Sequence, residues 1–418
     1  MTDVALRDAS AAEIRPQRTL WLLAIAHAVN HAEAVLLPLV YLRVAGDFNV
    51  GADAIAYLAA LGSFLAGAVQ LSYAGLTRVV PRRAILGAGG IVMGGAFAAQ
   101  ALAVGFPTFA LANVTSRLGG SPQHPVGNGL LAEQFPYERR GFAISAHIAG
   151  GNVGTVVAAL AGTWLIVGIG WRWTVVLFGL PAVVIALGVW LFVRETGADR
   201  AAAVAQGDLR HAFRAMLRAR DLLWLYAASI LGGGGRGLGV VNLFVLLYLT
   251  HVLGMPEGQA DLMYAVLIVF SVPAPLVAGW LSDRWGRKPL IVGVYLGGAV
   301  AFAVFIVAGP NLAGLWVGIV LMGIFSFAES PQLQALLADI SPPSIRDVSF
   351  ATYFTLAFGV GSLWVALYGA LIDLLGEAAG LPLAFWLMAG SFVLAALVVL
   401  PIRDPGFSRS SGPEAAAS

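Results

Sequence analysis

The segment that decides the fold is Gly279-Trp-Leu-Ser-Asp-Arg-Trp-Gly-Arg-Lys-Pro-Leu-Ile291, a short charged stretch between two long apolar runs. The runs are long enough to be membrane helices. The stretch joins them with so few residues that its charged side chains must meet neighbouring helix ends. Asp283 can accept hydrogen bonds at such an end, while Arg284, Arg287 and Lys288 favour the cytoplasmic side of the membrane.

Several segments occur twice along the chain. Leu76-Thr-Arg-Val-Val-Pro-Arg-Arg83 is a degenerate copy of Leu281 to Lys288, with Arg78 where the later copy has Asp283. The chain is therefore interpreted as two related halves in parallel orientation. Two further repeats support this duplication: Ser121-Pro-Gln123 with Ser330-Pro-Gln332, and Leu130-Leu-Ala-Glu133 with Leu336-Leu-Ala-Asp339.

The composition is that of a membrane protein. Of 418 residues, 59% are hydrophobic and 11% are charged, and the mean hydropathy is +0.85. We count twelve apolar runs of about 20 residues, each long enough to cross a hydrocarbon core about 30 Å thick. These runs must be helical, because lipid offers the backbone no hydrogen-bond partner and the runs are too long for barrel strands. We predict an all-α polytopic membrane protein.

The basic residues predict how the chain is oriented. Twenty of the 24 Lys and Arg residues lie in segments that alternate along the chain, which places both tails and the central linker in the cytoplasm. The net charge of +2, spread in this way, gives no reason to expect nucleic-acid binding. The basic segments contain Arg7, Arg15 and Arg18, Arg78 to Arg83, Arg139 and Arg140, the linker with the preceding Arg194, Arg284 to Lys288, Arg346, and Arg403 and Arg409.

Five segments follow from the apolar runs and the charges. In the linker, Arg210, Arg214 and Arg218 share one face and apolar residues share the other, which predicts a short amphipathic helix on anionic lipid headgroups.

No cysteine is present in the chain, which excludes disulfides and thiolate metal sites, and we expect no cleaved signal peptide. The predicted segments are an N-tail (residues 1–18), a six-helix bundle (19–194), the linker (195–221), a second six-helix bundle (222–402) and a C-tail (403–418).

Ionisable residues lie deep in the predicted spans of the first half. In the span of residues 20–44, His27 and His31 are four apart and share a face, with Asn30 beside them and Glu33 one turn beyond Asn30. Such groups are costly in lipid and therefore face the protein interior or a water-filled cavity. Alternatively, they only bond other helices and fix the packing.

The span of residues 108–134 carries a polar stripe with intervals of four, four, three and four residues, and Pro122 and Pro125 must bend it. Arg117 lies near mid-span, where it needs a carboxylate, a carbonyl cage or an anionic ligand. A structural ion pair with Glu33 or Glu329 is the alternative. The stripe consists of Asn113, Arg117, Ser121, His124 and Asn128, and the span of residues 141–167 adds His147 and Asn152.

The second half contains a glycine-rich stretch around one arginine. Gly232-Gly-Gly-Gly-Arg-Gly-Leu-Gly239 formally contains G-x-G-x-x-G, but no strand precedes it, so we reject a dinucleotide site. Glycine instead weakens the helix near mid-membrane, where it can bend and free carbonyls beside Arg236. Glu329 is the deepest carboxylate of this half, and Gln332 and Asn242 are further polar candidates.

The charged segment from Gly279 to Lys288 resembles the cytoplasmic loop motif of the major facilitator superfamily (MFS), G-x-L-x-D-R-x-G-R-K. Arg117 is similar to the arginine of the family's fourth-helix motif, and residues 141–154 match the first part of a pattern associated with MFS antiporters. The resemblance implies twelve transmembrane helices in two six-helix halves related by pseudo-twofold symmetry. It also implies a cytoplasmic gating motif formed by Gly279, Asp283, Arg284, Gly286, Arg287 and Lys288.

Two local stretches are similar to the fosmidomycin-resistance type of efflux protein. One is His27-Ala-Val-Asn30 with Leu36-Leu-Pro38, and the other begins Ser121-Pro-Gln-His-Pro125. Members of that group often have aspartate after the helix 1 asparagine, where this chain has His31.

We predict a secondary transporter that works by alternating access and exports a small, anionic organic compound or drug in exchange for protons. Proton-coupled uptake of an organic anion, transport of a divalent metal or metal chelate by the imidazoles with Glu33, and a non-transporting receptor are alternatives. We expect no enzyme activity, no cofactor and no resident metal, and a monomer in the inner membrane whose partners are a small molecule, protons and lipid. The candidate substrate-binding or proton-coupling residues are His27, Asn30, His31, Glu33, Asn113, Arg117, His124, His147, Asn152, Arg236, Asn242, Glu329 and Gln332.

Overall fold

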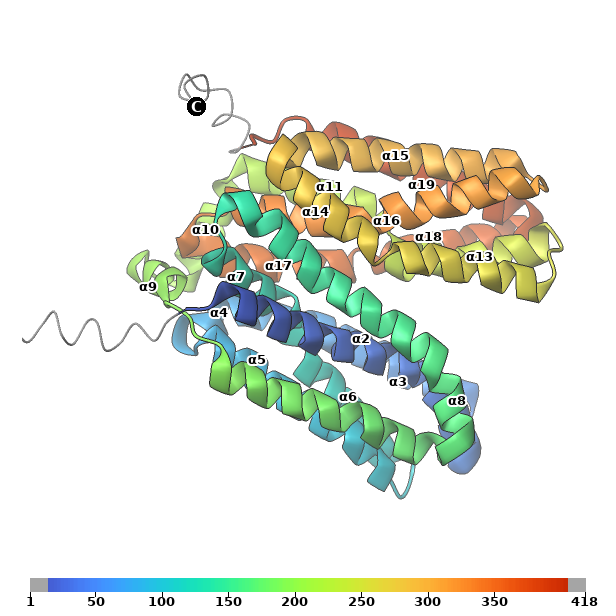
Figure 1. Cartoon of the computed structure of the whole chain (residues 1–418), viewed down its shortest axis with the longest axis horizontal. Coiled ribbons are helices and arrows are strands. Elements are labelled where there is room, and N and C mark those ends of the chain that lie inside the picture. Colours follow the sequence, from blue (N-terminus) through green and yellow to red (C-terminus); the bar gives the residue numbers. More distant parts are fainter. Residues whose placement is uncertain (1–13, 405–418) are drawn as a thin grey trace, which may run out of the picture. The chain divides into compact units, whose positions relative to one another are not determined.

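A computed structural model describes residues 14–404; Arg7, Arg409 and most of the two predicted tails lie outside this range. Within it the chain is helical and contains no strand (Figure 1). Nine helices of the described part are long and apolar enough to cross a membrane, or ten if the bent pair Arg220–Gly235 and Gly237–Val252 forms one span.

Two interrupted elements account for the remaining predicted spans. Helix α8 (Tyr137–Phe192) has 56 residues, enough for two spans, because it joins two helices at Gly170, where φ is 79° and ψ is 159°. Another span consists of α6 (Phe106–Gly120), a 3-10 turn and α7 (Pro125–Gln134). The predicted bend occurs there because proline rings remove backbone donors. The twelve-span prediction is confirmed.

The chain divides into two compact units. Unit 1 contains the described residues up to Pro136, together with Val153–Ala212 and Pro343–Ala351. Part of its core is an apolar cluster in which the rings of Phe109 and Trp171 meet edge to face, with centroids 5.8 Å apart. Its helices are α2 (Pro16–Asp47), α3 (Ala52–Val69), α4 (Tyr73–Val79), α5 (Arg82–Ala99), α6, α7, the later part of α8, and α9 (Ala198–Ala205).

Unit 2 contains Tyr137–Asn152, the residues from Phe213 to Pro342 and the described residues from Thr352 onward. Its core includes the packed rings of Phe302, Phe385 and Phe392. Its helices are the start of α8, α11 (Arg220–Gly232), α12 (Asn242–Leu247), α13 (Glu257–Phe270), α14 (Pro273–Trp285), α15 (Arg287–Ala308), α16 (Leu312–Ile340), most of α17 (Arg346–Gly359), α18 (Ser362–Leu375) and α19 (Glu377–Val399).

The predicted linker helix is α10 (Leu209–Arg218), which begins in unit 1 and ends in unit 2. Met216 is buried, and Arg210, Arg214 and Arg218 are exposed, as the pattern predicts, whereas Leu217 is 59% exposed. Asp208 precedes this helix, and hydrogen bonds from the backbone N–H and the ring of His211 hold the pKa of its carboxyl below the usual range.

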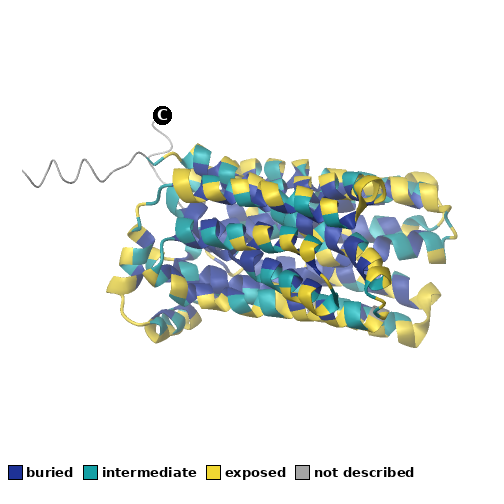
Figure 2. Cartoon of the chain, turned by 90° about the horizontal axis from the view of Figure 1, so that it is seen from below, coloured by how far each residue is buried: buried dark blue, intermediate teal, exposed yellow. Residues whose placement is uncertain are grey.

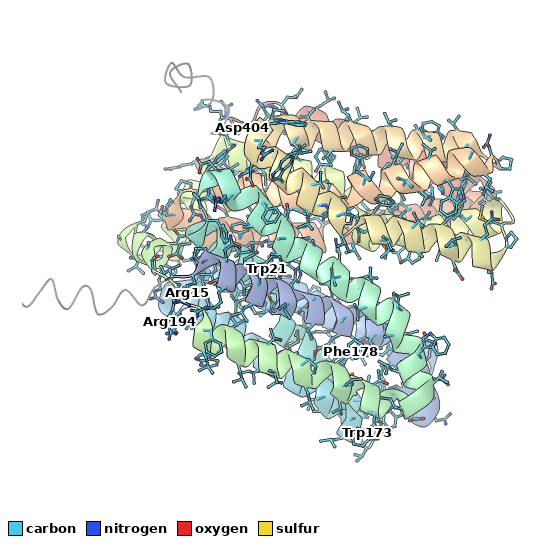
Figure 3. The ribbon with its side chains drawn as sticks, viewed as in Figure 1. Arg15, Trp21, Trp173, Phe178, Arg194 and Asp404 are labelled. Atoms are coloured by element: carbon cyan, nitrogen blue, oxygen red, sulfur yellow. The ribbon has the colours of Figure 1, made fainter. Side chains whose placement is uncertain are left out.

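Exposed and buried residues alternate along the individual helices (Figure 2), as expected for helices that pack on one face and meet lipid on the other. Large apolar side chains are accordingly exposed, and Trp173 is 67% exposed. In unit 1, Arg15 and Arg194 lie at the end where α2 begins, and Trp173 lies at the opposite end (Figure 3). Arg18 Nη2 donates to the Phe192 carbonyl over 2.6 Å at the basic end.

Candidate functional site

Three histidines of unit 1 lie together. His27 and His31 are one turn apart on α2, and His124 lies at the break between α6 and α7. The His27 ring centroid is 4.5 Å from that of His31 and 4.6 Å from that of His124, and the rings stand edge to face. His31 Nδ1 is 3.3 Å from Thr155 Oγ1 on α8. The i, i+4 spacing predicted the first two neighbours, but only the fold brings His124 to them.

The other polar groups of α2 face the start of the fourth span. Asn30 Nδ2 donates to the Gly120 carbonyl over 3.2 Å. This close approach requires glycine, because a Cβ at Gly120 would collide with the Asn30 amide. Glu33 is buried and interacts with Ser116, and it has no ion-pair partner among the described residues. Asn30 therefore links α2 to the end of α6, while Glu33 is a buried acid with no compensating cation among the described residues of unit 1.

Arg117 on α6 contacts hydroxyl groups rather than carboxylates. Its Nη1 donates to Ser63 Oγ over 3.0 Å, and its Nη2 is 3.5 Å from the Tyr41 hydroxyl. Tyr41 in turn donates to Asn113 Oδ1 over 3.1 Å. Among the described residues of unit 1, Arg117 has no ion-pair partner, so the predicted structural pair with Glu33 is not formed. The predicted alternative of a pair with Glu329, which lies in unit 2, stays a prediction.

A buried ion pair lies in unit 2. Arg236 Nε donates to Glu329 Oε1 over 2.6 Å, and the Tyr295 hydroxyl donates to Glu329 Oε2 over 3.2 Å. The Glu329 side chain is fully buried, and that of Arg236 is 17% exposed. Arg236 Nη2 also donates to the Ser229 carbonyl over 3.3 Å. Tyr295 was missed by sequence reasoning, because an aromatic residue in an apolar run gives no functional signal.

The glycine-rich stretch places Arg236 at a break in its helix, as predicted. Helix α11 ends at Gly232, a 3-10 turn follows, and the next helical segment is bent by 50° relative to it. Freed carbonyls are bonded by side chains: the Tyr368 hydroxyl donates to the Gly234 carbonyl over 2.9 Å. Asn242 Oδ1 accepts a hydrogen bond from the Gly239 N–H, where φ is +94°.

The remaining polar candidates lie elsewhere in unit 2. Asn152 Nδ2 donates to the Ser271 carbonyl over 2.6 Å. Gln332 Nε2 donates to Ser145 Oγ over 3.0 Å. His147 is buried on the first part of α8 and is not a member of the three-histidine cluster. Asn152 therefore joins α8 to the break between α13 and α14, and Gln332 joins α16 to α8.

The charged motif of unit 2 holds the first turn of α8. The backbone N–H groups of Gly141 and Phe142 donate to the two carboxylate oxygens of Asp283 over 2.9 and 2.8 Å. Arg287 is fully buried and donates to Asp283, to Asp339 over 2.8 Å and to the Tyr137 carbonyl over 2.6 Å. Gly286 has φ +93° at the turn between α14 and α15, a conformation that favours glycine.

The other residues of the charged motif make contacts next to the Asp283–Arg287 pair. The Arg284 guanidinium lies 3.7 Å from the centroid of the Trp280 ring. The Lys288 N–H donates to Asp404 over 2.9 Å, and its Nζ donates to the carbonyls of Leu400 and Ile402. Gly279 leaves room for Ser145, whose Oγ would lie 2.5 Å from an added Cβ.

The degenerate copy of the motif forms a different ion network in unit 1. Arg82 corresponds to Arg287 in the repeat and pairs with Glu133, with Asp199 over 3.1 Å and with Asp347 over 2.8 Å. Arg346 shares Asp199 over 2.6 Å. Sequence reasoning missed this network, although the repeat aligns Arg82 with Arg287 and Glu133 with Asp339. In place of the missing aspartate, Arg78 Nη2 donates to the Ala203 carbonyl in α9 over 2.7 Å.

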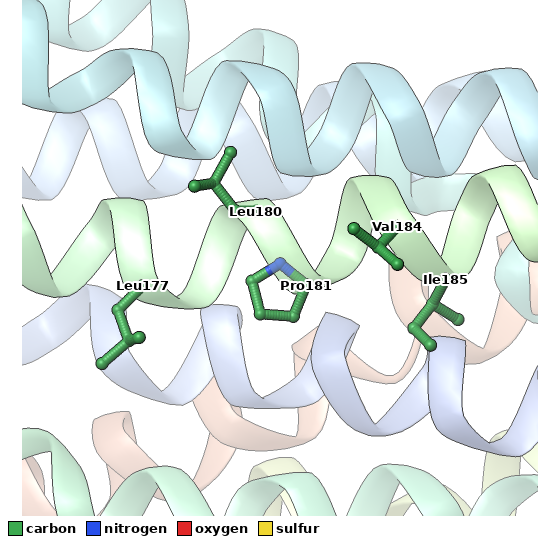
Figure 4. Close-up of a pocket in the computed structure, with 5 residues that line it drawn as sticks. All are labelled: Leu177, Leu180, Pro181, Val184 and Ile185. Carbon is green, nitrogen blue, oxygen red and sulfur yellow. The ribbon is translucent and has the colours of Figure 1, made fainter.

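One hollow on the surface of α8 is lined only by apolar residues (Figure 4). Leu177, Leu180 and Val184 each expose about half of their side-chain surface or more, and Pro181 and Ile185 complete the lining. Without a polar group it offers nothing to orient a charged substrate, and lipid chains can fill it.

Known proteins similar to this chain are transporters. The chain is 24% identical over 308 residues to a cis,cis-muconate transport protein of Acinetobacter baylyi, covering 70% of this chain and 71% of that protein. It is 30% identical over 132 residues to a Na(+), Li(+), K(+)/H(+) antiporter of Planococcus maritimus, but spans only 30% of that protein. The E. coli fucose:proton symporter has the same fold, with a TM-score of 0.77 at 14% identity, covering 93% of this chain and 98% of the symporter.

The family model described as Major Facilitator Superfamily matches residues 23–245 and 235–417. The two matches together include the polar residues of both units and the charged motif. These matches agree with the helical structure and with transporters as relatives. The members of this family are transporters and not enzymes. The chain is a multi-pass membrane transporter that belongs to the Major Facilitator Superfamily.

Proposed function

We propose that this transporter moves a small organic anion together with protons, and that the Arg236–Glu329 pair couples the two. The observation that carries the proposal is the buried pair itself, with Arg236 Nε 2.6 Å from Glu329 Oε1 at a break in the helix. A buried arginine that gives up its carboxylate needs another anion, because an unpaired buried charge is costly.

The geometry favours cotransport over exchange. A proton on Glu329 removes the charge that holds Arg236, and a substrate carboxylate can then replace it. Proton and anion therefore help each other to bind, and by linkage each raises the affinity for the other equally. A 100-fold effect requires about 2.7 kcal/mol, which is within the range measured for close charge pairs. This supports the predicted alternative of proton-coupled uptake rather than the leading prediction of export by antiport.

Unit 1 supplies a second reason to propose an anionic substrate. Arg117 is permanently charged, and among the described residues of unit 1 its guanidinium contacts hydroxyl groups and no carboxylate. Glu33, buried without a cation, is a second candidate proton carrier, because an ionised carboxylate is expensive away from water. A relative that transports cis,cis-muconate, an organic anion, is consistent with this choice.

Other parts of the proposal rest on the charge pattern. We propose that both tails and the linker lie in the cytoplasm, because the basic segments favour that side of the membrane. The proposal also retains a monomer in the inner membrane, with bundles at residues 19–194 and 222–402. The motif around Asp283 then lies on the cytoplasmic side, where release of the first turn of α8 would open the transporter. The local similarity to fosmidomycin-resistance proteins suggests phosphonates as test substrates beside carboxylates.

The test is reconstitution in liposomes that contain a pH-sensitive dye. Organic acids, including cis,cis-muconate, and phosphonates are added outside, and we expect the interior to acidify as proton and anion enter together. Glu329→Gln should abolish the acidification and retain exchange of labelled anion across the membrane. Glu257→Gln, which changes an exposed carboxylate of the same unit, is the matched control and should acidify at the wild-type rate.

Two outcomes would overturn the proposal. Alkalinisation of the interior on anion entry would show exchange instead of cotransport. Wild-type acidification by Glu329→Gln would show that another residue carries the proton. Size-exclusion chromatography of each variant distinguishes loss of coupling from loss of folding.

A further inference from the structure

We propose that His27, His31 and His124 bind one divalent ion of the late first-row transition metals, such as Zn²⁺ or Cu²⁺, within unit 1. Among the described residues, these three imidazoles form the group whose geometry could hold a metal. This inference is independent of the coupling pair proposed above, because all three histidines lie in unit 1 and Arg236 and Glu329 lie in unit 2.

The nitrogen atoms are close enough to converge on one ion. One ring nitrogen from each histidine lies within 4.8 Å of the other two. Three nitrogens bound to Zn²⁺ at about 2.0–2.1 Å lie about 3.3 Å apart. Small rotations of the side chains bridge this difference. His27 and His31 are i, i+4 on one helix, a spacing that allows two imidazoles to share a metal.

The surroundings suit a transition metal better than Mg²⁺ or Ca²⁺. Neutral imidazole is a preferred ligand of Zn²⁺, Cu²⁺ and Ni²⁺, whereas Mg²⁺ and Ca²⁺ prefer oxygen. Thr155 Oγ1, 3.3 Å from His31 Nδ1, can hold that ring so that Nε2 is the ligand atom. His27 is fully buried, whereas His31 and His124 are partly exposed, which provides a side from which the ion and a fourth ligand can enter.

A metal at this site would also connect α2 to the break between α6 and α7. His124 lies at the proline-bent break of the fourth span, so a bound ion would attach this break to α2. We therefore expect metal to stabilise the folded protein and to restrict movement of the α6–α7 break. The competing explanation is a hydrogen-bonded proton relay, which would occupy the same imidazoles without any affinity for metal.

The experiment uses the full chain, purified with a tag that contains no histidine. The two exposed histidines are first replaced, as His211→Gln and His251→Gln, to remove surface binding. We expect Zn²⁺ to bind with a stoichiometry of one by calorimetry and to raise the thermal midpoint. Cu²⁺ should give an electron paramagnetic resonance spectrum with splitting from imidazole nitrogens.

Single substitutions in this background identify the ligands. His27→Gln, His31→Gln or His124→Gln should each lower the Zn²⁺ affinity by about 100-fold or more. His147→Gln removes a buried histidine outside the cluster and should leave the affinity unchanged. The proposal is overturned if the background protein does not bind Zn²⁺, or if its Cu²⁺ spectrum lacks nitrogen splitting. This result does not depend on whether the cluster variants fold. Zn²⁺ affinity as high in all three variants as in the background protein would also overturn the proposal.

Discussion

The residue whose proposed role is most directly testable is Arg117, because its charge has no carboxylate partner among the described residues of unit 1. Arg117→Gln should raise the half-saturating concentration of the transported anion by about 30-fold or more, the loss of one buried charge contact. Arg117→Lys should recover part of the affinity, since it keeps the charge and loses the fork of donors. Both are measured as uptake of labelled anion against concentration.

Ser63→Ala is the control for Arg117. It removes the 3.0 Å hydrogen bond to the guanidinium and keeps the charge. A neutral partner contributes about 1 kcal/mol, so the affinity should change by less than about fivefold. If Ser63→Ala and Arg117→Gln have the same effect, Arg117 acts by packing and not by binding the anion.

At this scale the sequence identifies charged residues better than their partners. Glu329 and Arg236 are conspicuous because ionisable groups are rare in membrane spans. Their mutual bond depends on how two helical segments pack, because the two residues are 93 positions apart in the sequence. Tyr295 is part of the pair but looks like a core residue in the sequence.

At the scale of elements, the contact between α14 and the first turn of α8 depends on one glycine. A Cβ at Gly141 would collide with Arg287 Nη1 and lie 2.5 Å from Ser282 Oγ and 2.8 Å from Asp283 Oδ1. Because Arg287 is fully buried and held by several bonds, it cannot move aside cheaply. Gly141→Ala should lower the free energy of unfolding by about 1–3 kcal/mol, the cost of overpacking, and should lower the thermal midpoint in detergent.

Gly293→Ala is the matched control in the same unit. Nothing lies within 4 Å of a Cβ at this position on α15. Alanine is the better helix former, so this variant should be as stable as the wild type or up to about 1 kcal/mol more stable. Equal destabilisation by both changes would mean that the α8 contact is not tight.

Length and composition were enough to predict the elements, because each span must be about 20 apolar residues long. The prolines at 122 and 125 predicted the bend in the fourth span, and the glycines at 232–239 predicted the break beside Arg236. The π-helical turn at Tyr248–Val252 was not predictable, since no local sequence signal distinguishes it from ordinary helix. Nor was the grouping of Tyr137–Asn152 with unit 2, which depends on tertiary contacts.

On the scale of the molecule, Arg82 is bonded to three carboxylates that lie far apart in the sequence, and no motif predicted this network. It joins α5, α7, the linker through Asp199 and the start of α17 through Asp347, with only 3% of its side chain exposed. Arg82→Gln would leave three carboxylates without their shared cation, a loss of about 3–5 kcal/mol for a buried pair. We expect a lower thermal midpoint and increased proteolysis of the linker.

Arg83→Gln tests whether charge alone is responsible. Arg83 bonds Glu195 through its backbone N–H, which the substitution retains. Its stability should therefore stay within about 0.5 kcal/mol of the wild type. Linker proteolysis as fast as in Arg82→Gln would show that general charge, and not the network, holds the linker.

The absence of cysteine makes the orientation directly testable. Gln206→Cys lies in the linker and Pro310→Cys between α15 and α16, and both positions are exposed. In right-side-out vesicles, a maleimide that does not cross membranes should label Cys at position 310 and leave Cys at position 206 unlabelled. Inverted vesicles should give the opposite result, and labelling of both positions from one side would contradict the proposed cytoplasmic linker.

The tight turn at Gly170 determines which reagents can recognise this end of unit 1. The two halves of α8 reverse direction there within one glycine, and Figure 1 shows the second half returning beside α2. Almost no polypeptide is left between those spans for an antibody, a glycan or a protease to recognise. An affinity reagent for this end of unit 1 would therefore need an epitope inserted at the hairpin, because the turn itself offers no loop to recognise.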